Sequence, residues 1–291
     1  MRTRVANLTA AAVFSMTLSA CGGGGQDNAS ATNAAQGLWT GSSSDGITNQ
    51  DGTTITRMTL GLVLDNGTIF ELYGIPGDTS FGIVSGFLQG TLKMDGNGNL
   101  TSNDLVDYQA DLLAQSTSFA AATLTPMMQG SYVERTSLRS IFTYQIPTPR
   151  TVSYTSIYDK GYEAKADLSV IANPNPWNGV VSTMIVNTTS ALANAAATGG
   201  LAPGSIKIGT DGSLSIITTA CAASGTIKPH PTGNVYDVTA KFTDECFAGQ
   251  LLSGIGYVNV NDAGRNLYIA MTTSDRKSAI VFKGDSLPLV P

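Results

Sequence analysis

Hydrophobic residues in this chain occur in short alternating runs, separated by Gly, Asn, Asp or Pro. The run at 58–64 is followed by Asp65-Asn66-Gly67 and a second run at 68–73. An Asn-Gly pair between two apolar runs is a strong signal for a β-hairpin. Similar runs of five to eight residues occur later in the chain, at 137–144, 235–242, 255–260, 267–271 and 279–283. The pattern predicts an all-β, mainly antiparallel fold with tight turns.

Helical periodicity is limited to two short segments. In 104–122, the residues Leu105, Tyr108, Leu112 and Phe119 follow a spacing of three to four or its multiples, which predicts one helix. The alanine-rich segment 191–198 favours a second, shorter one. We therefore expect at most one or two short helices.

The chain contains an internal repeat. GTLKMDGNGNLT at 90–101 resembles GSIKIGTDGSLS at 204–215, and each half carries a Trp-x-Gly, beginning at Trp39 and Trp177. This predicts two related small β-barrel or β-sandwich units, 37–148 and 149–291. The prolines at 147 and 149 mark the junction, because proline disfavours helix and central strand alike. A single continuous sandwich is the alternative.

Composition excludes several classes of protein. The 291 residues are 42% hydrophobic and 13% charged, against about 25% charged in a typical globular protein. This combination argues against a disordered chain. With 16 Lys and Arg against 21 Asp and Glu, and no polybasic block, nucleic acid is not an expected partner.

The amino terminus carries a targeting signal. Arg2 and Arg4 precede a short apolar stretch that ends in Leu18-Ser19-Ala20-Cys21. This order resembles the signal peptide and lipobox of bacterial lipoproteins. The resemblance implies that residues 1–20 are removed, that the Cys21 sulfur receives a diacylglyceryl group and that the new amine is acylated. An ordinary secretory signal with a chance cysteine is the alternative.

A tether follows the anchor. Residues 21–36 begin with Cys21 and four glycines and continue with Asn, Ala, Ser and Thr, a composition typical of flexible linkers. In lipoproteins, an aspartate directly after the cysteine favours the inner membrane, whereas this chain has Gly22. The resemblance therefore implies an outer-membrane protein that contacts the membrane through covalent lipid and faces the periplasm or the cell surface.

The start of the body adds a second, looser resemblance. Gly37-Leu38-Trp39-Thr40-Gly41 followed by up-and-down hairpins is similar to the lipocalin-like barrels of Gram-negative surface lipoproteins. These proteins carry small β-barrels on flexible lipidated tethers. The resemblance implies an architecture and no particular ligand.

The other two cysteines form a candidate disulfide. With Cys21 modified in an oxidising compartment, we expect Cys221 and Cys246 to pair. The bond would close a loop of 25 residues. In the chain-entropy model such a loop contributes about 3–4 kcal/mol. Two free buried thiols are the alternative.

Three polar motifs resemble sites but are incomplete. Asp95, Asn97 and Asn99 start like a calcium loop, but the later glycine and glutamate are missing, so we expect a hairpin turn and no metal. Ser274-Asp-Arg-Lys277 matches Ser-x-x-Lys without its companion motifs and predicts a polar turn. Asp244 and Glu245 are adjacent and would point to opposite faces of a strand, so they do not form a general acid/base pair.

The single histidine also lacks catalytic partners. His230 lies between two prolines, which predicts an extended, exposed loop. No Gly-x-Ser-x-Gly, P-loop, Rossmann or Cys-x-x-Cys motif occurs in the chain. We therefore expect neither catalysis nor a cofactor.

A cluster of tyrosines is the remaining functional signal. Tyr144, Tyr154, Tyr158 and Tyr162 either form a binding surface or fill cross-strand positions. Together these observations predict a lipid-anchored, non-enzymatic β module of the cell envelope that binds a protein, a glycan or a small molecule. A structural or assembly lipoprotein and an envelope hydrolase are the alternatives.

Overall fold

The structure is a computed structural model. It describes residues 34–46, 48, 51–78, 80–109, 123–145, 149–185, 201–219, 221–243, 247–261 and 264–286. These residues belong to one compact unit, Ala31–Pro291. None of the helices in the described ranges has the length and apolar content needed to span a membrane.

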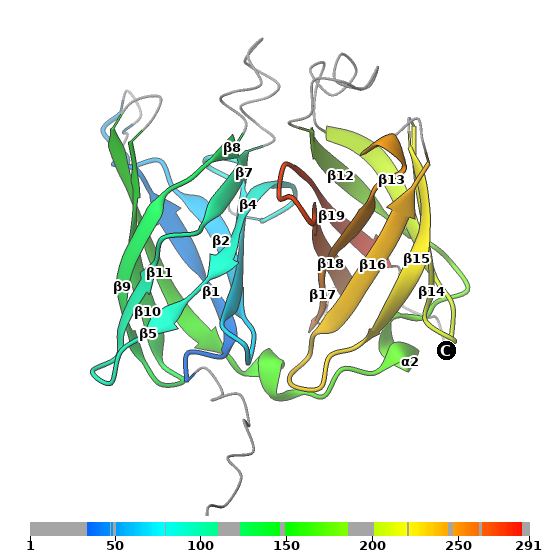
Figure 1. Ribbon diagram of the computed structural model, residues 1–291, viewed down its shortest axis with the longest axis horizontal. Coiled ribbons are helices and arrows are strands. Elements are labelled where there is room, and N and C mark those ends of the chain that lie inside the picture. The colour runs from blue at the N-terminus through cyan, green and yellow to red at the C-terminus, as the bar shows by residue number, and fades with distance from the viewer. Residues whose placement is uncertain are drawn as a thin grey trace, which may run out of the picture. The chain divides into compact units, whose positions relative to one another are not determined.

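The first part of the body is a curled antiparallel sheet (Figure 1). Its order is β5-β6-β9-β10-β11-β1-β2-β3-β4-β7-β8. The strands are β1 (Gly37–Ser44), β2 (Arg57–Val63), β3 (Thr68–Gly74), β4 (Val84–Thr91), β5 (Lys93–Met94), β6 (Asn99–Ser102), β7 (Val106–Gln109), β8 (Thr123–Leu124), β9 (Met127–Val133), β10 (Ser137–Tyr144) and β11 (Arg150–Asp159).

Three chain segments connect one edge of this sheet to the other. Only Leu92 separates β4 from β5, three residues separate β6 from β7, and Thr125 and Pro126 separate β8 from β9. Because the segments carrying β4, β7 and β8 at one end continue into β5, β6 and β9 at the other, the sheet curls around an enclosed core. That core contains Trp39, Ile69, Leu88, Leu138 and Phe142.

The second part is a closed barrel of eight antiparallel strands in sequence order. The strands are β12 (Trp177–Ile185), β13 (Leu201–Ile208), β14 (Ser213–Thr218), β15 (Ala222–Pro229), β16 (Tyr236–Phe242), β17 (Leu251–Asn261), β18 (Gly264–Thr273) and β19 (Ser278–Ser286). The described helices are all short: the 3-10 helices η2 (Lys160–Glu163) and η3 (Phe247–Gly249) and the α-helix α2 (Leu168–Ile171).

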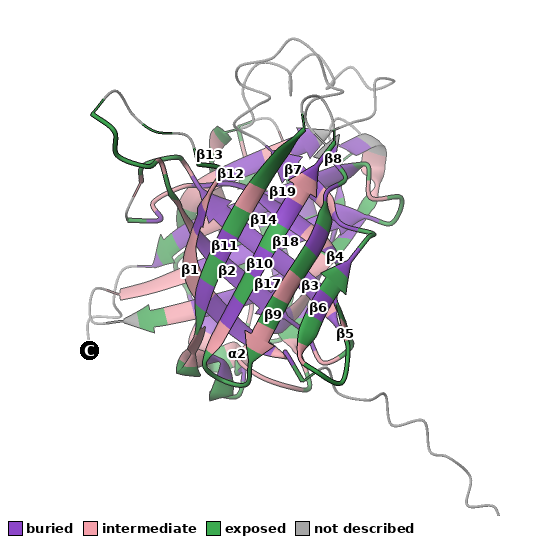
Figure 2. Cartoon of the chain, turned by 90° about the vertical axis from the view of Figure 1, so that its left-hand side faces the viewer, coloured by how far each residue is buried: buried purple, intermediate pink, exposed green. Residues whose placement is uncertain are grey.

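Burial differs between strands of the curled sheet. In β10, buried and exposed residues alternate, as expected for a sheet with one solvated face (Figure 2). In contrast, β2 and β3 are buried almost continuously. Their outward side chains share an apolar cluster with the barrel: Leu62, Phe70 and Leu72 with Tyr257, Tyr268 and Val281. These strands therefore separate two cores.

Polar contacts also join the curled sheet to the barrel. The Ser182 hydroxyl donates to the carbonyl of Val84 at 2.8 Å, and the Tyr108 hydroxyl donates to the carbonyl of Arg276 at 2.8 Å. The Arg276 side chain in turn donates to the carbonyl of Gln89. The β18–β19 turn thus fixes the position of β4 and β7.

The predicted all-β antiparallel class is confirmed, and the hairpin at 65–67 forms the β2–β3 turn. The predicted helix over 104–122 is wrong where the structure describes it, because Val106–Gln109 is strand β7 and pairs with β4. Its remainder at 110–122 and the predicted helix at 191–198 lie outside the described residues.

The internal repeat corresponds to two hairpins with equivalent turns. In β5–β6 the Asp95 amide donates to Asn99, and in β13–β14 the Gly209 amide donates to Ser213. The turn glycines Gly98 and Gly212 have φ angles of 80° and 79°, a region that favours glycine. The repeat is therefore also present in the local structure.

The boundary between the curled sheet and the barrel lies further along the chain than the predicted 148/149. β11, which follows the prolines proposed as the junction at 148/149, lies between β10 and β1 in the first sheet, and the barrel begins at Trp177. Ala35, assigned to the tether, is fully buried and accepts a hydrogen bond from the Trp39 indole. The folded body therefore includes the end of the predicted tether.

The predicted disulfide stays a prediction. Cys221 packs at the edge of the barrel core, whereas Cys246, with Asp244 and Glu245, lies outside the described residues. The lipidated residue Cys21 and the signal peptide also lie outside them.

The glycine of the second Trp-x-Gly motif is required by close strand packing. A Cβ at Gly179 would lie 1.9 Å from the carbonyl oxygen of Lys283 on β19. We expect Gly179→Ala to lower the free energy of unfolding by about 3 kcal/mol, because backbone atoms must move. Urea unfolding measures the change.

The matched control is Gly96→Ala, in an exposed turn where a new Cβ would meet nothing within 4 Å. We expect this control to change stability by less than about 0.5 kcal/mol. Equal stability of the two variants would contradict the assigned β12–β19 register.

Candidate functional site

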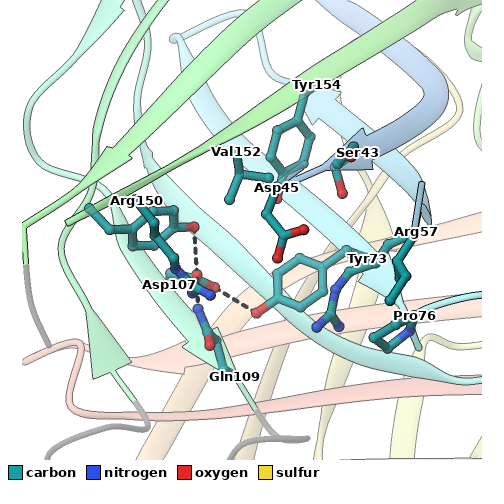
Figure 3. A pocket seen from close by; sticks show the side chains of 13 residues that line it. Ser43, Asp45, Arg57, Tyr73, Pro76, Asp107, Gln109, Arg150, Val152 and Tyr154 are labelled. Carbon is teal, nitrogen blue, oxygen red and sulfur yellow. Dashed lines mark hydrogen bonds between the residues drawn. The ribbon is translucent and has the colours of Figure 1, made fainter. Parts of the chain in front are cut away.

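A cavity of about 230 Å³ lies at one end of the curled sheet (Figure 3). It is formed where β1, β3, β7 and β10 end and where β2 and β11 begin. Because neighbouring strands are antiparallel, these ends meet at the same rim. The lining residues are Ser43, Ser44, Asp45, Ile55, Arg57, Tyr73, Pro76, Asp107, Gln109, Tyr144, Arg150, Val152 and Tyr154.

The strand register places the inward side chains at this end of the sheet directly beside one another on neighbouring strands. Ser43 pairs with Tyr154 on one side and with Arg57 on the other, and Tyr144 pairs with Arg150. Paired residues of an antiparallel sheet point to the same face. The polar side chains therefore converge, although they come from segments far apart in the sequence.

Asp107 is the centre of the polar network. Its side chain is 1% exposed and accepts hydrogen bonds from the Tyr73 hydroxyl at 2.6 Å, the Tyr144 hydroxyl at 2.8 Å and the Gln109 amide. Burial raises the pKa of this carboxyl, and the three donors and the charge of Arg150 partly offset that effect. The buried acceptor is thus satisfied by the protein itself.

Gly86 makes the Tyr73–Asp107 contact feasible. It pairs with Tyr73 across β3 and β4, and a Cβ at this position would lie 2.4 Å from the Tyr73 hydroxyl oxygen. The absence of a side chain lets the tyrosine ring cross β4 and reach the carboxylate on β7.

Two arginines flank the network. The Arg57 guanidinium lies 5.6 Å from the centre of the Tyr73 ring and donates to the Gly74 carbonyl and the Ser85 hydroxyl. The Arg150 guanidinium lies 4.7 Å from the centre of the Tyr144 ring. Both are cation–π contacts. With Asp45 at the exposed edge, the cavity wall carries two cationic and two acidic side chains.

Ser43 and Tyr154 form part of the cavity floor. Ser43 is 2% exposed, and its hydroxyl lies beside the Tyr154 hydroxyl but makes no hydrogen bond of normal geometry within the described part of the chain. Figure 3 shows this hydroxyl pointing into the cavity. Burial and the carboxylates of Asp107 and Glu71 hold the pKa of Tyr154 well above its usual value, so its hydroxyl stays protonated.

A second carboxyl, Glu71, is buried in the same sheet. It is 4% exposed, pairs with Gly61 on β2, and occupies the space that a side chain at Gly61 would fill. Burial raises its pKa to about 8, and the Thr59 hydroxyl opposes this only in part. Glu71 is therefore mainly protonated at neutral pH, which avoids an unpaired buried charge.

His230 is not exposed, contrary to the expectation from its flanking prolines. Its side chain is 11% exposed and lies between two aspartates, with Nδ1 at 2.7 Å from Asp237 and Nε2 at 3.4 Å from Asp65. Asp65 belongs to the β2–β3 turn, so a contact distant in sequence buries the histidine. His230 is not among the residues lining the cavity.

Two motifs have the predicted turn structures. The Asp95 carboxylate accepts hydrogen bonds from the amides of Asn97 and Asn99 within the β5–β6 turn. Ser274–Lys277 connects β18 to β19, and Asp275 accepts from Thr273 at 2.6 Å. Among the described residues, no cluster of three or more His, Cys, Asp or Glu side chains is arranged to bind a metal.

Two members of the tyrosine cluster line the cavity. Tyr144 and Tyr154 are 3% and 4% exposed and belong to the core of the curled sheet, so they fill cross-strand positions and also form the cavity wall. Tyr158 packs edge-on against Trp39 at 5.4 Å. Tyr162 accepts a hydrogen bond from Gln36.

Sequence reasoning missed the other main cavity residues. Arg57, Tyr73, Asp107 and Arg150 match no motif, and Asp107 fell inside the predicted helix. The sequence signal that could have identified them is that these polar residues lie near the ends of strands, at positions where the alternating pattern points inward. That signal becomes specific only when the strand register is known.

Comparison with known proteins provides no family. No protein-family model matches the chain, and no curated protein matches it. A structure of a protein of unknown function from the DUF3598 family of Nostoc punctiforme aligns with 10% identity and a TM-score of 0.28, over 87% of this chain and 97% of that one. A Transferrin Binding Protein B double mutant from Haemophilus parasuis aligns with 7% identity and a TM-score of 0.29, over 85% and 75%. At these values neither similarity carries an argument about function.

Glu71 predicts a specific pH dependence of stability. Because its pKa rises from the ordinary 4.5 to about 8 on folding, the folded chain binds the proton more tightly. The contribution of Glu71 to the free energy of unfolding therefore falls as the pH increases from about 4.5 to about 8. We expect Glu71→Gln to be neutral near pH 5 and to stabilise the protein by about 3–5 kcal/mol near pH 8.

Urea unfolding of wild type and Glu71→Gln across this pH range tests the prediction. The difference between the two proteins isolates Glu71, because every other titrating group is common to both. Parallel stability curves would contradict the assignment of a buried, protonated Glu71.

Proposed function

We propose that this protein is a lipid-anchored protein of the bacterial outer membrane that binds a small molecule in the cavity of its curled sheet. The observation that carries the proposal is the polar end of an otherwise apolar core. Asp107, Tyr73, Tyr144 and Gln109 form a preorganised network there, beside an open space. Convergent polar groups in a concave, partly apolar site are typical of small-molecule binding sites.

The network supports binding rather than catalysis. Asp107 is 1% exposed and accepts three hydrogen bonds from its own neighbours, so a substrate would have to displace part of this network before the carboxyl could act as a general base or a nucleophile. Its role in the proposal is to orient the two tyrosines and Gln109 that border the ligand.

The proposed location depends on the amino-terminal sequence. Leu18-Ser19-Ala20-Cys21 supports lipidation at Cys21, and Gly22 supports export to the outer membrane. Acyl chains on this residue would anchor the protein stably, because two or more chains bury much more methylene than one. The anchor and the ligand site are separate parts of the proposal and are tested separately.

Lipidation is tested by metabolic labelling with palmitate. We expect wild type to incorporate the label and Cys21→Ala to lose it, because the thiol is the acceptor of the diacylglyceryl group. Cys221→Ala serves as the matched control and should label like wild type. Equal labelling of wild type and Cys21→Ala would contradict the proposed anchor.

Ligand binding is tested by a thermal-shift screen of sugars, amino acids and organic acids. We expect a compound that stabilises wild type to lose about tenfold in affinity with Arg150→Ala, which removes a charged donor from the cavity rim. Arg139→Ala removes an exposed arginine from β10 that does not line the cavity, and it should bind like wild type. Absence of any stabilising compound, or equal losses in both variants, would contradict the proposed site.

A further inference from the structure

We infer that the ligand of the cavity is a neutral sugar residue. This inference rests on the proposed function and specifies its ligand class. It follows from three properties of the cavity: its size, its charge balance and the kind of hydrogen-bonding group that the protein leaves unused.

The size of the cavity limits the ligand to about one ring. Its volume is about 230 Å³, below the range of about 300–1,000 Å³ found for most small-molecule sites. A nucleotide, a lipid or a peptide would not be enclosed, whereas a single sugar residue would be.

The charge balance favours a neutral ligand. Arg57 and Arg150 are matched in number by Asp45 and Asp107. Asp107 has its three donors, and Arg57 donates to Gly74 and Ser85. Arg150 lies over the Tyr144 ring, and its charge acts on Asp107. A ligand with its own net charge would upset this balance in a partly desolvated site, which is unfavourable.

The unused group in the cavity is a hydroxyl. Ser43 is 2% exposed, and apart from its contact with the Tyr154 hydroxyl, which lacks the geometry of a normal hydrogen bond, its oxygen has no hydrogen-bond partner within the described ranges. A buried polar atom without a partner costs free energy, and a ligand group that satisfies it gains affinity. A hydroxyl both donates and accepts, so a polyhydroxylated ligand matches Ser43 and the neighbouring Ser44 in either orientation.

The rest of the wall fits the apolar face of a sugar ring. Ile55, Pro76, Val152 and the Tyr154 ring contribute apolar surface opposite the charged groups. A sugar presents C–H groups on its faces and hydroxyls around its edge, so it contacts both kinds of wall together. An amino acid of similar size has two charged ends, and its ammonium group would need an acidic partner inside the cavity, where Asp107 already accepts three hydrogen bonds from the protein.

The test measures binding by isothermal titration calorimetry with the full lipidated chain, solubilised in a detergent without a sugar headgroup. The probes are glucose, galactose and mannose as neutral sugars, alanine as a zwitterion and succinate as an anion. We expect a neutral sugar to bind, and Ser43→Ala to weaken it by about three- to tenfold through loss of one hydrogen bond.

The matched control is Ser153→Ala, because Ser153 is exposed on β11 next to Tyr154 and does not line the cavity. It should bind like wild type. Binding of alanine or succinate alone, weakened by Arg150→Ala, would overturn the sugar inference and leave the proposed function intact. Failure of all probes here and of every compound in the thermal-shift screen would overturn both, and sugar binding unchanged in Ser43→Ala would overturn the inference.

The methyl glycoside of the sugar that binds distinguishes a free sugar from the terminal residue of a glycan as the natural ligand. A free sugar held in the cavity by all its hydroxyls would lose affinity on methylation of the anomeric oxygen. The terminal residue of a glycan would tolerate the methyl group. Either result supports a neutral sugar as the ligand.

Discussion

Burial of β2, β3 and β4 on both faces is the constraint on which the rest of this structure depends. Along β3, Ile69 faces the core of the curled sheet, and the adjacent Phe70 and Leu72 face the cluster shared with the barrel. A strand that lies between two cores has no face for solvated side chains, which explains the apolar runs at 58–64 and 68–73. It also means that the curled sheet and the barrel complete each other's cores.

The cavity arises within the same constraint. A polar side chain that points inward from these strands, or from β7 beside β4, is shielded from solvent, so it must find a partner or become neutral. Asp107 follows the first course through Tyr73, Tyr144 and Gln109, and Glu71 follows the second through its raised pKa. The polar end of the curled sheet therefore combines a rigid hydrogen-bonded network with a protonated carboxyl beneath it.

The local pattern of the sequence was sufficient to predict strands and hairpins, because both depend on neighbouring residues. The hairpin at Asn66-Gly67 and the two repeated turns at Gly98 and Gly212 follow from backbone preferences alone. The prediction of a helix over 104–122 failed at Val106–Gln109 for a physical reason. Leu105 packs in the core of the curled sheet and Tyr108 in the cluster shared with the barrel, so apolar residues on both sides of one extended segment imitated helical spacing.

The site itself was out of reach of sequence reasoning. Tyr73 and Asp107 are 34 positions apart, and Asp65 and His230 are 165 apart. Only the strand register and the packing of sheet on barrel bring these groups together. Of the four clustered tyrosines, Tyr144 and Tyr154 line the cavity, and their proximity was visible in the sequence because they lie on a single hairpin.

Glycines on the strands next to β3 explain why large polar groups fit in so narrow a space. Gly61 on β2 faces Glu71, and Gly86 on β4 faces Tyr73. In both pairs the β3 side chain occupies the volume that a neighbouring side chain would need. Glu71 and Tyr73 thus each lie over a glycine, and the end of the core beyond them stays open instead of filling with apolar side chains. The same two pairs set the position of the tyrosine hydroxyl on Asp107 and the depth of the protonated carboxyl. The shape and the polarity of the cavity therefore have a common origin in the register of three strands.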